Sequence, residues 1–143
     1  DAERIGVSGF SLGGIAAFYG FAVDERLAAA ALFCGGVGSM RRLIREGATG
    51  YHSVYYYVPG LIAGGLDHPA LAPALAPRPL LVCGATEDRG MPLEGVREFE
   101  AAARKAYEAR GAGERFRVWV EEGPHALTRS AFETAADWLV GEM

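Results

Sequence analysis

A serine, a histidine and a carboxylate occur in this sequence in the settings that acyl-transfer chemistry requires. The serine is Ser11, within Gly9-Phe10-Ser11-Leu12-Gly13. A short apolar run at residues 4–8 precedes it, and a proline-free run rich in alanine and aromatics follows over residues 12–22. This pattern predicts a buried strand, a sharp turn and a helix, with Gly9 and Gly13 letting strand and helix pass closely. A G-x-S-x-G pattern also occurs in ordinary glycine-rich turns, but strand and helix on either side favour a strained serine with an exposed hydroxyl.

A base for that serine is expected at His125. Residues 115–121 alternate polar and apolar side chains, as a strand near a sheet edge does. His125 follows in a turn, so it is expected beyond the carboxyl end of a strand, where ligands gather in α/β sheets. Its unperturbed pKa of about 6.5 suits proton transfer near neutral pH. The other histidines, His52 and His68, are expected to be packing or surface groups.

The acid is expected after a third strand, at residues 79–84, a short apolar run bounded by proline and glycine. Glu87 and Asp88 both follow it and compete for the role. A carboxylate there can fix the histidine tautomer and stabilise the imidazolium. Asp88 is preferred because its shorter side chain is easier to preorganise, and Glu87 is then expected to be solvated.

Several stretches together resemble the carboxyl-terminal half of an α/β-hydrolase, nearest to the dienelactone-hydrolase and acetyl-xylan-esterase-like serine esterases. The matching stretches are RIGVSGFSLGG at 4–14, DERLA at 24–28, APRPLL at 76–81, Asp88 followed four residues on by Pro92, and GPH at 123–125. The resemblance implies Ser11 as nucleophile, Asp88 as acid and His125 as base. Two departures stand out. Ala85 occupies a position where glycine is common, and the nucleophile is serine rather than the cysteine of true dienelactone hydrolases.

The resemblance also implies an incomplete fold, because the family sheet has about eight strands. The sequence predicts four parallel strands, at 4–8, 27–35, 79–84 and 115–121, with helices on both faces. Residues 1–143 are therefore expected to form a partial α/β-hydrolase domain that lacks the family's N-terminal strands. Residues 36–76 are expected to form a cap-like or specificity excursion within it.

Two consequences follow for chemistry and association. The Leu12 backbone N–H is expected to be one oxyanion donor, while the family's second donor comes from a missing loop. Losing one such donor typically costs about 10²–10³ in turnover. Strand 4–8 would form an exposed apolar edge, which favours self-association.

The substrate pocket is expected to involve aromatic side chains. The candidates are Phe10, next to the serine, and the run Tyr55, Tyr56 and Tyr57. Tyrosine offers flat apolar area with a polar tip, which suits sugars or aryl esters. The alternative is that these tyrosines only pack the excursion onto the domain. Residues 61–75, with several prolines, are expected to be irregular.

A helix is expected at residues 94–110, and a last helix is expected after an N-cap at Thr128. Phe132 is expected on the buried apolar stripe of this last helix. Cys34 and Cys83 are expected to be buried free thiols near strand ends.

Composition excludes several classes of partner. The net charge of −4 offers no basic face for nucleic acid, and no apolar run approaches the 18 residues needed to cross a bilayer. The histidines and cysteines have no metal-binding spacing, so neither a metal nor another cofactor is expected. A cytoplasmic location is favoured, although the true N-terminus is not in view.

These observations predict a serine hydrolase that cleaves carboxylic esters through an acyl-enzyme. Its substrate would be a small-molecule ester with a small acyl group, such as an acetyl ester of a carbohydrate. The first alternative is a serine peptidase of the prolyl-oligopeptidase type. The second is a catalytically silent half-domain that acts through complementation or self-association.

Overall fold

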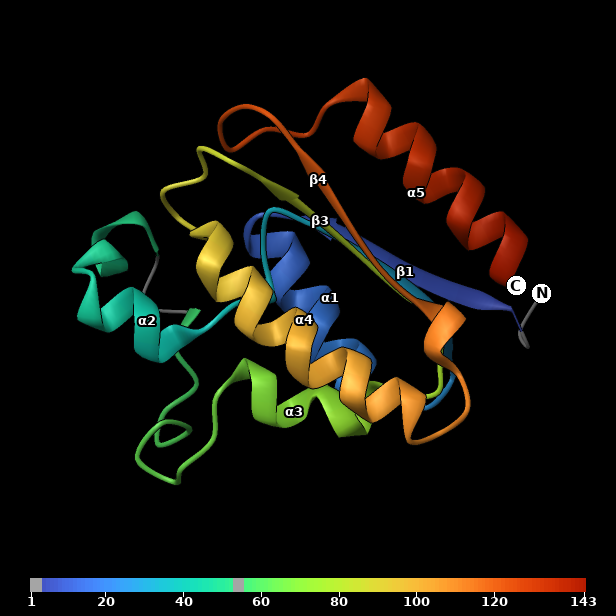
Figure 1. Ribbon diagram of the computed structural model, residues 1–143, viewed down its shortest axis with the longest axis horizontal. Coiled ribbons are helices and arrows are strands. Elements are labelled where there is room, and N and C mark those ends of the chain that lie inside the picture. The colour runs from blue at the N-terminus through green and yellow to red at the C-terminus, as the bar shows by residue number, and fades with distance from the viewer. Residues whose placement is uncertain (1–3, 53–55) are drawn as a thin grey trace.

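Four strands of six or seven residues build one parallel sheet at the centre of the molecule, and the two inner strands are continuous apolar runs (Figure 1). The computed structural model describes residues 4–52 and 56–143. The strands lie in the order β1 (Ile5–Phe10), β2 (Leu27–Phe33), β3 (Leu80–Ala85) and β4 (Phe116–Glu121). Every neighbouring pair is parallel, with Phe10 opposite Phe33 and Phe33 opposite Cys83, so all carboxyl ends meet at one edge.

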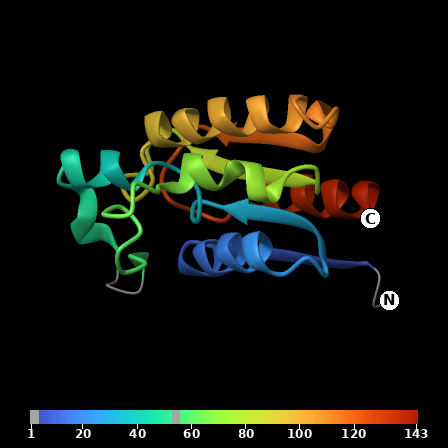
Figure 2. The ribbon, with the colours of Figure 1, turned by 90° about the horizontal axis from the view of Figure 1, so that it is seen from below.

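Helices cover both faces of this sheet, as Figures 1 and 2 show. One face is covered by α1 (Leu12–Val23), α3 (His68–Leu75) and α4 (Leu93–Glu108), and the other by α5 (Arg129–Glu142). The short elements are α2 (Met40–Arg45), η1 (Ala48–Tyr51) and η3 (Gly113–Arg115). In Figure 1, α2 and η1 lie beyond the carboxyl ends of the strands. None of the helices in the described residues is long and apolar enough to cross a membrane.

The two faces hold separate apolar cores. The larger core joins α1, α3 and α4 to the sheet around fully buried Phe18, Phe21 and Phe99. The smaller core lies under α5, where Ala131 and Ala135 meet β2 and β3. Strand β3 is buried along its whole length, whereas β1 is an edge strand with exposed residues. The predicted fold class, a parallel four-stranded α/β unit with helices on both faces, is confirmed.

Three local predictions need correction. Residues 68–75 form a helix rather than irregular structure, because Asp67 caps it and Pro69 suits its first turn. Phe132 is 59% exposed instead of buried, since the side of the last helix that packs on the sheet carries Ala131, Ala135 and Leu139. Gly13 has open space where a Cβ would lie, so it is not required for close packing among the described residues. The predicted free, buried cysteines and the Thr128 N-cap are confirmed.

Candidate active site

Ser11 lies in a strained turn between β1 and α1. Its backbone has φ 56° and ψ −120°, a conformation that is rare for a residue with a side chain. Two glycines make the turn sterically feasible. A Cβ on Gly9 would lie 2.1 Å from the Gly13 carbonyl oxygen, and one on Gly35 would lie 2.1 Å from the Ser11 carbonyl oxygen. The close approach predicted for Gly9 is therefore present, and Gly35 is a second contributor that the sequence analysis missed.

Asp88 is fixed in the turn that follows β3. It is buried, and its Oδ1 accepts hydrogen bonds from the backbone N–H groups of Gly90 and Met91, both at 2.9 Å. Its Oδ2 lies 2.7 Å from Nδ1 of His125. Glu87, the competing carboxylate, is exposed. Of the two candidates, Asp88 is thus the one that contacts the histidine.

His125 reaches Asp88 because the loops after β3 and β4 are tied together. The Glu87 N–H donates to the Gly123 carbonyl at 2.8 Å, and the Gly123 N–H donates to Thr86 Oγ1 at 3.1 Å. The Phe10 ring packs against the imidazole with centroids 4.9 Å apart. Phe10 is not among the described residues that line the cavity beside Ser11, so the structure places it against His125 instead.

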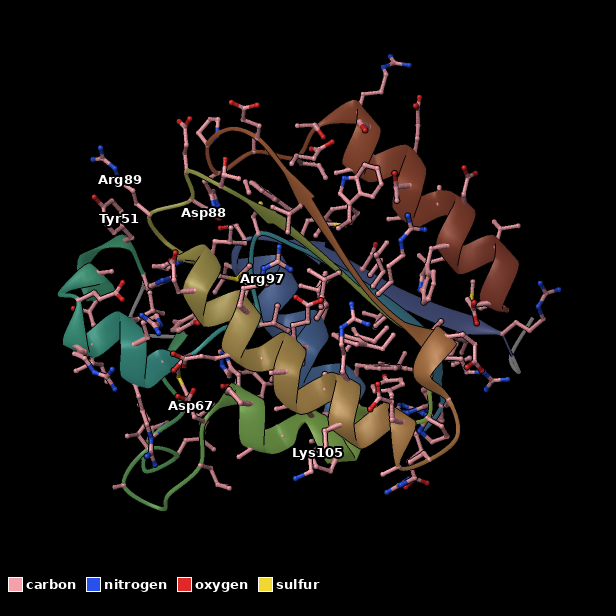
Figure 3. The ribbon with its side chains drawn as sticks, in the orientation of Figure 1. Tyr51, Asp67, Asp88, Arg89, Arg97 and Lys105 are labelled. Carbon is pink, nitrogen blue, oxygen red and sulfur yellow. The ribbon has the colours of Figure 1, made fainter. Side chains whose placement is uncertain are left out.

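Ser11, Asp88 and His125 line one open cavity of about 1030 Å³ at the carboxyl ends of the strands. Glu46, Arg89 and other charged or polar side chains form its outer wall. Figure 3 shows Tyr51, Asp88 and Arg89 at this end of the molecule. Within the described residues, no hydrogen bond joins the Ser11 hydroxyl to His125, although both side chains line the same cavity.

The Cys34 thiol lies beside the same carboxylate. Its sulfur and the ligand atoms of Asp88 and His125 lie within 4.8 Å of one another, close enough to hold a metal ion. Burial, with the charge of Asp88 as a second cause, raises the pKa of the Cys34 thiol to about 11. The Cys34 thiol is therefore protonated at neutral pH in this environment.

His52, from the excursion between β2 and β3, lines the cavity and packs against tyrosines of the same segment. The His52 Nε2 contacts the Gly90 carbonyl oxygen, and its ring stacks on Tyr56 with centroids 4.1 Å apart. Tyr56 is buried, Tyr57 is half-buried, and Tyr55 lies outside the described residues. Sequence reasoning placed His52 in packing or on the surface and missed its contact with the Asp88 turn, because a single histidine in a polar segment carries no periodic signal.

His68, in contrast, is fully buried away from the cavity. Its Nε2 lies 3.1 Å from the Tyr19 hydroxyl, and its Nδ1 has no partner within the described part of the chain. Burial lowers the pKa of His68 to about 4, so it is neutral at pH 7. The prediction that His68 is a packing residue is confirmed by its burial.

A parallel sheet with a strained serine after one strand, and a hydrogen-bonded aspartate–histidine pair after two others, is the arrangement of the α/β-hydrolase fold. The predicted resemblance to this superfamily is confirmed, while the particular branch within it stays a prediction. No family model matches the sequence.

Comparison with known proteins agrees with this class. The chain is 34% identical over 133 residues to "Putative hydrolase YtaP" of Bacillus subtilis (strain 168), covering 93% of the chain and 42% of that protein. It superposes on a glucuronoyl esterase from Solibacter usitatus with a TM-score of 0.83 at 22% identity, covering 99% of this chain and 43% of the esterase. A carbohydrate esterase family 15 glucuronoyl esterase from Caldicellulosiruptor kristjansonii gives a TM-score of 0.80 at 27% identity, covering 100% and 44%. The chain thus spans less than half the length of each of these proteins.

Proposed function

We propose that this chain carries the catalytic residues of a serine hydrolase that cleaves carboxylic esters. The observation that carries the proposal is the hydrogen bond between buried Asp88 and His125, two residues that line the same cavity as the strained Ser11. The similarity to a hydrolase and to carbohydrate esterases supports ester hydrolysis rather than peptide hydrolysis.

In this mechanism each residue has one task. Because His125 Nδ1 bonds to Asp88, its Nδ1–H donates to the carboxylate and Nε2 is left to accept the Ser11 proton. The serine oxygen attacks the ester carbonyl, and Asp88 stabilises the imidazolium that forms. His125 then returns the proton to the leaving alcohol, and water releases the acyl group by the reverse sequence.

The developing oxyanion is held in part by the start of α1. Leu12 is the first residue of this helix, and the first N–H groups of a helix have no partner within it. The Leu12 N–H is therefore the donor that this chain offers to the oxyanion.

We propose an ester of a carbohydrate with a small acyl group as the substrate. Tyr51 and the charged side chains around the cavity suit a hydroxyl-rich group, and the names of the similar structures point to carbohydrate esters. Tyr56 and Tyr57 pack with His52 at the edge of this region, where they support the wall of the pocket.

Hydrolysis of 4-nitrophenyl acetate by purified protein tests the proposal. We expect Ser11→Ala and His125→Ala each to reduce kcat/KM by at least about 10³-fold. Glu87→Gln is the matched control, because this carboxylate is adjacent to Asp88 but exposed, and it should leave the rate within about twofold. Equal activity in all four proteins would contradict the proposal.

One observation favours a second function, that of a catalytically silent half-domain that self-associates. Strand β1 lies at the edge of the sheet, and Ile5 on it is 42% exposed. An apolar strand edge is a template for pairing with another chain. Sedimentation at rising protein concentration should show dimers that Ile5→Lys abolishes, and a concentration-independent monomer would rule this function out.

A further inference from the structure

Two hollows of very different size adjoin Ser11. One is the polar cavity of about 1030 Å³, and the other is a recess of about 60 Å³. Ser11, Tyr51 and His52 line both hollows. The rest of the recess is lined by Leu12, Ile15, Cys34, Gly35, Tyr56 and Met91.

The recess is uncharged, unlike the cavity. Ile15 and Met91 are apolar and almost fully buried. Burial raises the pKa of the Tyr56 phenol well above its usual value, and the Cys34 thiol is likewise protonated at neutral pH. Burial also lowers the pKa of His52, which keeps its ring neutral. An apolar group fits these walls, whereas a charged or hydroxyl-rich group would lose its hydration there.

The position of His125 decides which half of an ester enters the recess. The leaving alcohol must take its proton from His125, and His125 lines the cavity but is not among the recess residues. The alcohol therefore lies on the cavity side of Ser11. The acyl chain then points away from the alcohol, into the recess, while the carbonyl oxygen faces the Leu12 N–H.

The volume of the recess sets the length of the acyl group. A space of about 60 Å³ holds about two to four water-sized groups. We propose that the recess is the acyl-binding subsite and that it accepts acetyl or propionyl groups but neither long acyl chains nor a uronoyl ring. This proposal rests on the proposed ester hydrolysis by Ser11. It assigns the bulky carbohydrate to the alcohol side of the ester.

A series of 4-nitrophenyl esters tests the subsite, because the leaving group stays constant while the acyl group grows. We expect kcat/KM to be highest for acetate or propionate and at least about tenfold lower for hexanoate. Met91→Ala shortens a side chain in the recess wall while keeping the backbone N–H that binds Asp88. It should raise the hexanoate-to-acetate ratio at least about tenfold.

Two further variants separate the subsite from general effects on folding. Ile15→Val enlarges the recess by a single methyl group, so it should raise the same ratio by about threefold even if Met91→Ala fails to fold. Val96→Ala is the control, because Val96 shares the buried cluster of Met91 but lines neither hollow. It should leave the ratio unchanged.

The outcomes distinguish the subsite from the activity itself. A flat acyl-length profile, or a ratio that neither recess variant changes, would overturn the subsite while Ser11-dependent hydrolysis remained. Faster cleavage of methyl glucuronate than of an acetylated sugar would also overturn it. Absence of any Ser11-dependent hydrolysis would overturn both proposals.

Discussion

Two buried aspartates in this molecule, Asp67 and Asp88, differ in how their carboxylate oxygens are used. Asp67 is 7% exposed and accepts from the Ser39 hydroxyl and from the backbone N–H groups of Met40, Arg41 and His68, at 2.7–3.1 Å. Asp88 is 3% exposed and accepts two backbone N–H groups, both at Oδ1. Its Oδ2 contacts His125 at the edge of a cavity.

The difference separates a structural carboxylate from one suited to chemistry. Three of the hydrogen bonds of Asp67 come from the start of α2 and the fourth comes from α3, so this carboxylate joins the two helices that Figure 3 shows on either side of it. Burial alone would raise the pKa of Asp67, but these hydrogen bonds outweigh burial and hold its pKa below the usual value. Asp88 uses Oδ1 to accept the hydrogen bonds that fix its turn, and its Oδ2 contacts the His125 imidazole, which can carry a proton.

The largest expected effect is the loss of activity in Asp88→Asn. The amide oxygen can still accept the two backbone N–H groups, so the free energy of unfolding should change by less than about 1.5 kcal/mol. The amide nitrogen would donate to His125 Nδ1 and impose the wrong tautomer, which should reduce the hydrolysis rate by about 10⁴-fold. Ester hydrolysis and urea denaturation measure the two quantities. A large loss of stability with little loss of rate would reverse the roles assigned to the two aspartates.

Asp67→Ala should show the opposite pattern. Removing a carboxylate that accepts from four donors, three of them buried, leaves those donors unpaired, so the free energy of unfolding should fall by about 3–5 kcal/mol. Because Asp67 is not among the residues that line the cavity, the folded fraction should keep its rate of ester cleavage within about threefold. Denaturation at pH 7 and active-site titration give both values. A hundredfold slower folded fraction would mean that Asp67 also supports the site.

The acid sensitivity of the fold should come from the residue next to Asp67. A lowering of the His68 pKa from 6.5 to about 4 means that the free energy of unfolding is about 3 kcal/mol larger when His68 is neutral in both states than when it must be protonated. The unfolded chain binds the extra proton, so this stability is present above pH 6.5 and is lost as the pH falls toward 4. His52, whose pKa is also lowered, adds to the slope, whereas Asp67 loses its contribution only below its unfolded pKa of about 3.8.

His68→Gln provides the matched comparison for this slope. Glutamine can form a hydrogen bond with Tyr19 without titrating. Between pH 7 and pH 4 the free energy of unfolding of the variant should therefore fall by about 3 kcal/mol less than that of the wild type. Denaturant titrations at both pH values measure the difference. Parallel pH profiles would show that His68 does not carry the acid sensitivity.

The smallest expected effect concerns a single donor to Asp67. Ser39 donates its hydroxyl to Asp67 at 3.0 Å and also accepts from the Arg42 N–H at 3.3 Å as the N-cap of α2. Ser39→Ala should therefore lower the free energy of unfolding by about 1 kcal/mol without changing the rate of ester cleavage. A change in rate would show that the Asp67 network reaches the site.

The sequence was informative where apolar runs end in chemically distinctive residues. Strands β2 and β3 are continuous apolar runs, so their place in the sheet and the position of Asp88 after β3 could be predicted. His125 could be placed by chain order and by the turn before it. Contacts between distant segments could not be predicted, because nothing local marks Asp67 as the acceptor for the Met40 N–H or His52 as a neighbour of Gly90.

Helix α3 is a different case, since its signal was present in the sequence. Asp67 followed by Pro69 is an N-cap with proline in the first turn. Pro73 in the same segment obscured this signal, because a proline inside a helix usually breaks the helix. The exposure of Phe132 depends on how α5 is rotated against the sheet, which the helical period alone does not fix.

The most direct test of the account is labelling of the wild-type chain with a fluorophosphonate, followed by mass spectrometry of the modified peptide. The account predicts a single adduct on Ser11, with a labelling rate that falls by at least about 10³-fold in His125→Ala and Asp88→Asn but stays unchanged in Glu87→Gln. A folded chain that is not labelled, or a Ser11 adduct that forms equally fast without His125, would contradict it.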